Sequence, residues 1–193
     1  MNAPARNRIG PNAILQHLPV LDAAIGPRMR HALLHLAEVA EPPPDSGMIP
    51  QEDVARFHRF VRLYLPDKAE AVQHAAGLGT ADYILAHRIP RPAQALIRAL
   101  PRPLGARLLA AAIAKHAWTF AGTGTFRIAA RRPLTFEIGR NPLAVPARAP
   151  GCTWHAAVFA GLFGALVWPG VTVVETACCG CGDRVCRFEL HPR

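Results

Sequence analysis

Apolar residues recur every three or four positions through much of the first 116 residues, which is the spacing of one face of an α-helix. The first stripe runs from Ile14 to Ile25 and ends at Gly26 and Pro27, a pair that interrupts helices. Similar stripes predict helices over residues 29–40, 54–65 and about 104–116. We therefore expect the first half of the chain to be helical.

Glycine and proline residues divide this helical region. Gly77 and Gly79 predict the end of one helix, Thr80 is a suitable N-cap for the next, and Pro90 predicts where that one stops. The segment 41–50 contains three consecutive prolines, which cannot continue a helix and favour an extended chain. We expect an N-terminal helical extension with a Pro-rich linker over residues 1–50 and the main domain over residues 51–193.

Beyond these helices the apolar pattern changes to alternation, which is typical of β-strands. A helix is also predicted over about 153–167, with His155, Phe159, Leu162 and Leu166 on one face. Strands are predicted over residues 120–129, 134–138, 171–176 and 185–190. The predicted fold class is α+β, a helical N-terminal region followed by an antiparallel sheet packed with helices.

The chain is basic, with 22 Lys and Arg against 13 Asp and Glu and a formal net charge of +9. Such a charge predicts attraction to anions. The arginines are scattered along the sequence and no nucleic-acid-binding motif is present, so we expect no nucleic-acid partner. The segment 156–168 is apolar throughout but too short to span a bilayer. We expect it to be a buried helix, with contact to a membrane surface as the alternative.

The five cysteines lie between residues 152 and 186. Their odd number argues against a disulfide framework, and residues 1–15 lack an apolar run followed by a small-residue cleavage site. We therefore expect reduced thiols in a cytoplasmic compartment. Cys152, Cys178 and Cys186, with Glu175 close by, have the donor types of a tetrahedral zinc site. Cys181 competes with Glu175 for the fourth position, because Cys178 and Cys181 form a CxxC pair.

Two other interpretations of the cysteines are open at this point: an iron–sulfur cluster, and a set of small buried side chains with one free thiol. The predicted elements favour zinc. Cys152 would begin the 153–167 helix, Glu175 and Cys178 would end a strand, and Cys186 would lie on the returning strand of a hairpin. A metal with four protein ligands there leaves no open position, so it would stabilise the fold and catalyse nothing.

The segment from Cys152 to Phe188 resembles the 4-vinyl-reductase domain, a small-ligand-binding module that also occurs in phenol-sensing bacterial regulators. Cys152, Glu175, Cys178 and Cys186 reproduce, at separations of 23, 3 and 8 positions, the spacing of the zinc ligands in those sensors. The resemblance implies a ligand-binding fold over residues 51–193 with a C-terminal zinc site. It also implies Glu175, and not Cys181, as the fourth ligand.

Longer blocks resemble the J-protein family of bacteriochlorophyll biosynthesis, whose historical name is divinyl-protochlorophyllide (4- or 8-) vinyl reductase. These blocks are IGPNAILQ near the N-terminus, TADYILAHRIP (80–90), HAWTFAGTGTF (116–126), CTWHAAVFAGLF (152–163) and the CCGCG loop. The resemblance implies a photosynthetic bacterium and a tetrapyrrole ligand such as Mg-protoporphyrin or a protochlorophyllide. It also implies a cytoplasmic location or a peripheral one at the photosynthetic membrane.

A tetrapyrrole needs a flat apolar surface, partners for its propionates and a ligand for its magnesium. Arg127 or Arg140 are candidates for the propionates, and His116 or His155 for the metal. The candidate stacking residues are Trp118, Phe120, Trp154, Phe159 and Phe163. Each has a simpler alternative: aromatic residues at helical or strand spacing belong to the core more often than to a pocket, and arginines are more often solvated.

The family name requires a source of hydride or electrons, and the sequence offers none that we can identify. Gly122-Thr123-Gly124 lacks the third glycine of a dinucleotide-binding motif, and zinc has no redox chemistry. We expect a tetrapyrrole-binding protein that presents intermediates to the magnesium chelatase large subunit or to the following methyltransferase. The alternatives are a vinyl reductase with an external electron donor, and a ligand-sensing regulator or assembly factor. The apolar stripes of residues 1–50 would suit a homodimer interface or a cover for the sheet.

Overall fold

The computed structural model describes residues 7–193, and its N-terminal part is helical as expected. It contains β1 (Arg8–Ile9), α1 (Asn12–Leu15), α2 (Leu18–Ile25), α3 (Pro27–Leu36), β2 (Ile49–Pro50) and α4 (Gln51–Tyr64). The helix predicted from Ile14 to Ile25 is wrong in one respect, because it is two helices with a break at residues 16–17. Pro19 lies in the first turn of α2, where its missing N–H costs nothing, whereas inside one long helix it would remove a backbone hydrogen bond.

The apolar stripe predicted for residues 29–40 is only partly correct. Met29 and Leu36 are exposed, and α3 ends at Leu36. The buried polar member of α3 is Arg30, which binds Asp22 at 2.7 Å and Glu41 at 2.5 Å. An arginine buried with two carboxylates satisfies its charge within the fold, and periodicity alone cannot show this.

The helix α5 (Ala69–His87) runs through Gly77 and Gly79, so the predicted helix end there is wrong. The reason is the contact between α5 and α9 (Thr153–Leu166). A Cβ atom on Gly77 would lie 2.6 Å from the Cβ of Ala157 and 2.6 Å from the carbonyl oxygen of Trp154. Gly77 is therefore a point of close helix approach, and burial compensates for its poor helix propensity.

Three further helices follow: α6 (Arg91–Ala99), α7 (Arg102–Lys115) and α8 (Trp118–Ala121). The helix predicted over about 104–116 is confirmed. The strand predicted over 120–129 begins five residues later than expected, because Phe120 and Ala121 belong to α8 and Gly122 turns the chain with φ of 54°. Gly122 and Gly124 thus lie in the turn before a strand.

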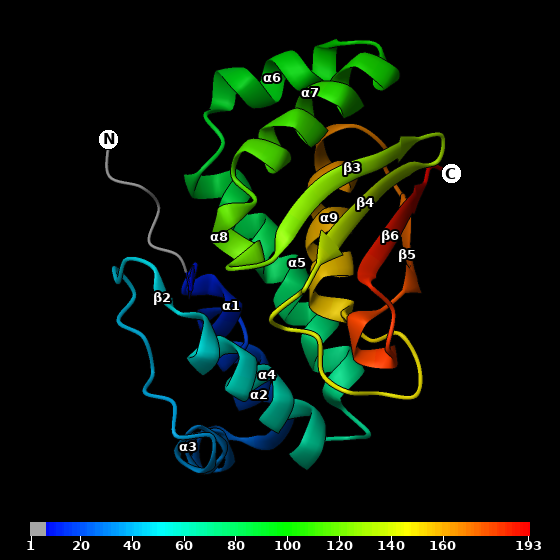
Figure 1. Ribbon diagram of the computed structural model, residues 1–193. Helices are drawn as coiled ribbons and strands as arrows, with labels where there is room; N and C mark the ends of the chain where they lie inside the picture. Colours follow the sequence, from blue (N-terminus) through cyan, green and yellow to red (C-terminus); the bar gives the residue numbers. More distant parts are fainter. Residues whose placement is uncertain (1–6) are drawn as a thin grey trace.

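Four strands form one antiparallel sheet in the order β3-β4-β6-β5. They are β3 (Thr125–Arg131), β4 (Leu134–Gly139), β5 (Thr172–Ala177) and β6 (Val185–His191). α9 covers one face, and α5 lies behind α9 (Figure 1). On that face Phe136 and Phe188 contact Phe159 of α9, with ring centroids 5.0 and 5.5 Å apart. The expected α+β class is therefore confirmed.

The residues of the N-terminal extension share one hydrophobic core with the rest of the described chain. Ile9, Ile14 and Leu21 are fully buried, as are Phe57 of α4 and Phe163 of α9. The segment 156–168 is largely internal, which agrees with the buried-helix expectation. No helix in residues 7–193 is both long enough and apolar enough to cross a membrane.

Candidate functional site

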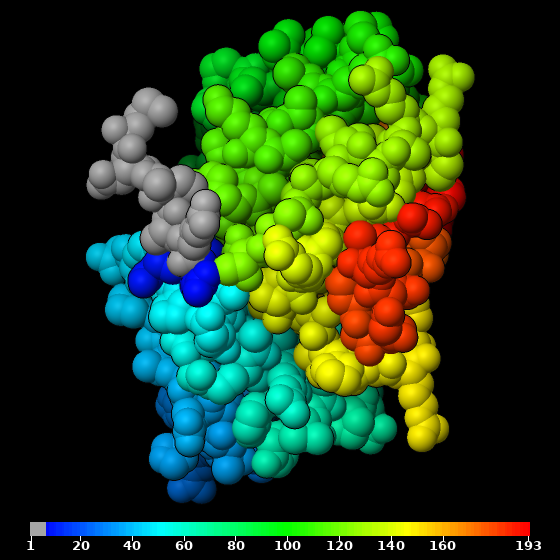
Figure 2. Space-filling view, in the orientation of Figure 1, coloured from blue at the N-terminus to red at the C-terminus, as the bar shows by residue number. Residues whose placement is uncertain are grey.

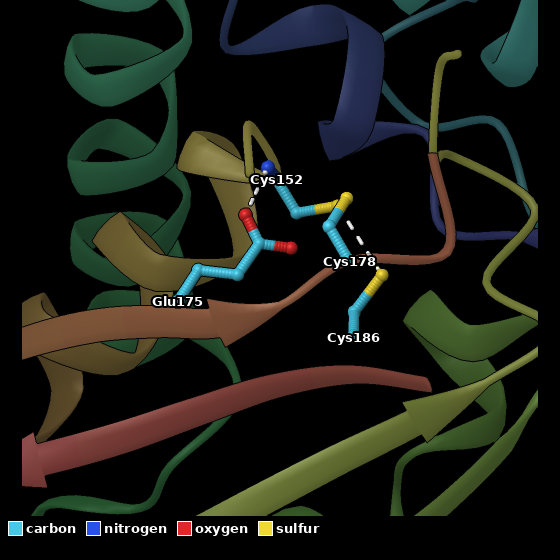
Figure 3. A group of neighbouring side chains, drawn as sticks. All are labelled: Cys152, Glu175, Cys178 and Cys186. Atoms are coloured by element: carbon cyan, nitrogen blue, oxygen red, sulfur yellow. Dashed lines mark hydrogen bonds between the residues drawn. The ribbon is translucent and has the colours of Figure 1, made fainter. Parts of the chain in front are cut away.

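Four side chains from separate elements meet below the start of α9 (Figure 3). Cys152 is the N-cap residue of α9, and Glu175 lies in β5. Cys178 follows β5 directly, before the single turn η1 (Cys179–Cys181), and Cys186 lies in β6. The structure thus places all four predicted metal ligands in one group. The three thiols are at most 4% exposed.

The distances in this group suit one tetrahedral ion. The three sulfur atoms and the carboxylate of Glu175 lie within 4.8 Å of one another. The Sγ of Cys152 is 3.8 Å from that of Cys178 and 3.5 Å from that of Cys186. Ligands about 2.3 Å from a tetrahedral zinc are about 3.8 Å from each other. The thiol spacing therefore fits zinc, although no ion is part of the structure.

The carboxylate of Glu175 is half satisfied. Its Oε2 accepts a 2.6 Å hydrogen bond from the backbone N–H of Cys152, whereas its buried Oε1 has no hydrogen-bond partner. Burial raises the pKa of this carboxyl to about 8. An unpartnered buried oxygen is costly, and a cation bound among the sulfurs would both satisfy it and favour its ionised form.

The thiols also differ in acidity because they share hydrogen bonds. The hydrogen bond with Cys152 lowers the pKa of Cys178 to about 4 and that of Cys186 to about 7. The same hydrogen bonds, together with burial, raise the pKa of Cys152. A buried group that supplies several anionic donors is suited to a divalent cation, since the ion neutralises charge that water cannot reach.

The site has a supporting layer that sequence reasoning missed. The side-chain N–H of Asn141 donates to the sulfurs of Cys152 and Cys186 at 3.5 and 3.4 Å. Asp183 accepts a 2.8 Å hydrogen bond from the backbone N–H of Cys178. Such donors orient metal ligands and tune their charge. Asp183 could have been found from its place in the predicted hairpin turn, but Asn141 had no local sequence signal.

The two remaining cysteines lie outside the group. Cys181 is exposed, and the Sγ of Cys179 faces the carbonyl oxygen of Ile138 at 3.9 Å. The five cysteines are all free thiols. The CxxC alternative therefore does not describe the geometry, because the short turn η1 carries Cys181 away from Cys178.

The structure brings together four of the predicted pocket residues in one aromatic cluster. Phe120 lies 6.0 Å from Phe159 and 6.1 Å from His155, and His155 lies 5.0 Å from Trp154, between ring centroids. Phe163 joins through Phe136 at 5.8 Å. Phe159 and Phe163 are fully buried, so a macrocycle would contact them only after this packing opens. We refer to Phe120, Trp154, His155, Phe159 and Phe163 as the aromatic cluster.

Two buried histidines that were not predicted adjoin the aromatic cluster. The ring of His58 lies 5.7 Å from Trp154 and 4.8 Å from His17. The Nε2–H of His58 donates to the carbonyl oxygen of Ala13 at 3.0 Å. Burial lowers the pKa of His58 to about 4 and that of His155 to about 3. Both imidazoles are therefore neutral near pH 7. The available signal was the spacing of four residues between Val54 and His58 along the apolar face of α4.

The other predicted ligand-binding residues lie elsewhere. His116 is exposed at the end of α7, and Trp118 is 43% exposed. Arg127 forms an ion pair with the buried carboxylate of Glu137, which Arg187 also binds at 2.8 Å. Arg140 is exposed and has a φ of 50°. The structure therefore does not group these four with the aromatic cluster.

Solved structures share this fold at low sequence identity. An H-NOX protein from S. oneidensis in the Fe(II)NO ligation state matches with a TM-score of 0.58 and 9% identity, covering 96% of this chain and 99% of the other. A mutant H-NOX structure from the same organism in the Fe(II) state matches with a TM-score of 0.54 and 11% identity, over 95% and 96% of the two chains. This likeness concerns the fold alone.

Sequence comparison identifies much nearer relatives. Residues 138–192, which contain all four site residues, match the 4-vinyl-reductase domain. The bacteriochlorophyll synthase 23 kDa chain of Cereibacter sphaeroides is 57% identical over 97% of this chain and 92% of its own length. That of Rhodobacter capsulatus is 54% identical over 96% and 88%. The expected kinship is thereby confirmed: this chain belongs to the family of the bacteriochlorophyll synthase 23 kDa chains, proteins with a 4-vinyl-reductase domain that are associated with bacteriochlorophyll biosynthesis.

Proposed function

We propose that this protein binds a tetrapyrrole intermediate of bacteriochlorophyll biosynthesis and presents it to a pathway enzyme. The observation that carries the proposal is His155, a neutral imidazole in the aromatic cluster whose buried Nε2 has no hydrogen-bond partner. A neutral imidazole nitrogen with a free lone pair can ligate a metal, and aromatic rings offer stacking surfaces to a flat macrocycle. The names of the relatives support the pathway, and the H-NOX structures with Fe(II) support a fold able to hold a metal centre.

Binding in this proposal requires the aromatic cluster to open. Phe120 is partly exposed and belongs to α8, a single helical turn followed by the Gly122 turn. Movement of α8 away from α9 would uncover Phe159 and His155. Short elements joined by glycine turns are the parts of a fold that open at low energetic cost, so we assign the entrance to α8.

We propose a structural zinc ion held by Cys152, Glu175, Cys178 and Cys186. Bound there, zinc supplies a cross-link between the start of α9 and the β5–β6 hairpin. The four residues leave no ligand position for a substrate, so in this proposal they catalyse nothing. Glu175 contributes the oxygen that has no hydrogen-bond partner. The proposed compartment is the cytoplasm, where thiolates stay reduced.

The proposed recipients are the magnesium chelatase large subunit and the methyltransferase that follows it. A homodimer through the N-terminal helices is less favoured, since their buried residues Ile14, Leu21 and Leu33 already pack within the chain's own core. Presentation to an enzyme predicts that the tetrapyrrole is released unchanged. It also predicts that the tetrapyrrole alters the affinity for the recipient by a factor that is equal in both directions.

A titration tests the binding proposal directly. Purified protein is titrated with Mg-protoporphyrin and with divinyl-protochlorophyllide, with and without NADPH, and followed by the Soret band and by tryptophan quenching. We expect saturable binding with an intact vinyl group, and a Soret shift that His155→Ala removes while His116→Ala leaves it in place. Conversion to the ethyl product would replace this proposal with a vinyl reductase, and the absence of binding would refute it.

The zinc proposal has its own matched pair of variants. Cys178→Ser and Cys186→Ser should purify without stoichiometric zinc and melt at a lower temperature, whereas Cys181→Ser, which changes an exposed thiol outside the group, should retain the metal. Elemental analysis of protein purified without chelators provides the measurement. A metal-free parent protein, or equal zinc loss in the Cys181 variant, would contradict the assignment.

A further inference from the structure

The positive charge of this chain is confined to one stretch. Residues 83–136 contain nine Arg and Lys residues and no Asp or Glu, so this stretch alone accounts for the net charge of +9. The rest of the chain is balanced, with thirteen residues of each sign. The arginines that are scattered along the sequence thus become segregated when acidic residues are considered with them.

In the fold this stretch forms one end of the molecule. α6 and α7 pack side by side at the end opposite α2 and α3, and the turn between β3 and β4 lies nearby (Figure 1). Figure 2 shows the same end as a continuous surface of residues from this stretch. Arg91, Arg102 and Arg107 are exposed and make no hydrogen bond or ion pair within residues 7–193.

Large apolar side chains are exposed on the same two helices. Leu96 is 54% exposed, Leu104 47% and Leu108 41%. Ile97 and Leu109, on the inner faces, are buried, so the outer leucines are additional to the ones that the core requires. We call Arg91, Arg102, Arg107, Leu96, Leu104 and Leu108 the α6–α7 surface.

Two hollows flank the start of α7. One, of about 280 Å³, is lined by Arg98 and Arg102, and the other, of about 320 Å³, by Arg107, Arg131 and Arg132. Trp168 and Leu190 lie in the second hollow beside the arginines. Both hollows therefore combine guanidinium groups with apolar walls and contain no carboxylate, which is the environment that a phosphate joined to an acyl chain requires.

We propose that the α6–α7 surface docks the protein on a bilayer that contains anionic phospholipids. Arginines would attract the negatively charged surface and the leucines would enter the boundary between headgroups and acyl chains, as in interfacial amphipathic helices. The leucines decide between a bilayer and another polyanion, because an acidic protein or a nucleic acid binds arginines without apolar insertion. The proposal does not depend on tetrapyrrole binding, and it replaces residues 156–168, now known to be internal, as the site of membrane contact.

Vesicle flotation with the full chain tests this proposal. We expect no binding to phosphatidylcholine vesicles, and binding to vesicles with about one-third phosphatidylglycerol in low salt (about 0.05 M) that weakens in high salt (about 0.5 M). Arg91→Gln, Arg102→Gln and Arg107→Gln combined should weaken binding about 100-fold, since each basic side chain at the surface contributes a factor of about five. The control combines Arg28→Gln, Arg59→Gln and Arg148→Gln, which removes the same charge from exposed positions elsewhere.

A second pair of variants tests the insertion. Leu104→Gln with Leu108→Gln should weaken binding about tenfold, whereas Leu36→Gln with Leu63→Gln, on exposed leucines of other helices, should not. The absence of binding to anionic vesicles would overturn the proposal, as would equal losses in an α6–α7 variant and its control. Full binding by the Leu104/Leu108 variant would also overturn it, because the surface would then fit an acidic protein or a nucleic acid.

Discussion

Replacing Gly161 with alanine should destabilise the protein, whereas the same change at Gly164 should stabilise it. Both glycines lie in α9, so both substitutions gain about 1 kcal/mol of helix propensity. The two sites differ in their surroundings. A Cβ atom on Gly161 would lie 2.5 Å from the Cβ of Ala81 on α5, and a Cβ atom on Gly164 would have no neighbour within 4 Å.

The size of the effect follows from these distances. Carbon atoms in contact are normally about 3.5–4.0 Å apart, so α9 and α5 must separate by about 1 Å to admit the methyl group at position 161. Overpacking of this kind costs up to about 3 kcal/mol, which leaves a net loss of about 2 kcal/mol for Gly161→Ala. Gly164→Ala should gain about 1 kcal/mol, so the two variants should differ by about 3 kcal/mol.

Urea unfolding followed by circular dichroism measures this difference, and thermal melting offers a second assay. For a chain of this size, 1 kcal/mol corresponds to about 2–4 °C in Tm, so the variants should melt about 6–12 °C apart. If Gly161→Ala proves as stable as Gly164→Ala, the two helices do not approach as closely as described, and our explanation for the uninterrupted α5 fails with it.

Three other perturbations have defined outcomes. Between pH 7.5 and 5 the free energy of unfolding should fall by about 2 kcal/mol on account of His58, because its pKa is lowered to about 4 in the fold and protonation from pH 6.5 downwards favours the unfolded chain; urea unfolding should show a smaller pH slope for His58→Gln, and equal slopes would contradict the burial. Asn141→Ala should weaken zinc binding about 10–100-fold in a competition with a chromophoric chelator, since it removes two N–H···S bonds, and unchanged affinity would show that these bonds do not tune the ligands. Glu137→Ala should cost about 3–5 kcal/mol, more than Arg187→Ala, because it leaves two arginines without their shared carboxylate; a smaller loss for Glu137→Ala in urea would refute that order.

The sequence predicted the elements that have a strong local pattern. α4, α7, α9 and the strands β4, β5 and β6 agree with their predicted ranges to within a few residues, because their apolar periodicity coincides with the face that they bury. Gly77 was misjudged because a glycine at a helix end and a glycine at a helix crossing look alike until the partner helix is known. The partner, α9, lies about 80 residues further along the chain.

The same limit separates the two halves of the candidate site. The four proposed zinc ligands are close in sequence except for Cys152, and their fixed spacing in a resembling family identified them. Asn141, His17 and His58 reach the site or the aromatic cluster from distant elements, so no local pattern could identify them. Trp118 and His116 failed to join the aromatic cluster because α8 forms a helical turn where a strand was expected, and this changes the direction of every side chain in it.

The pairing of β1 with β2 has a consequence for how two copies of the chain can associate. Arg8 pairs with Pro50 and Ile9 with Ile49, so residues 10–48 form a loop that is closed at its base. A segment tethered at both ends cannot reach across to a neighbouring molecule as a free arm could. Exchange of the N-terminal helices between chains would first require β1 to leave β2 and the backbone N–H of Gly10 to leave the carbonyl oxygen of Thr119. The closed base thus keeps these helices on their own chain.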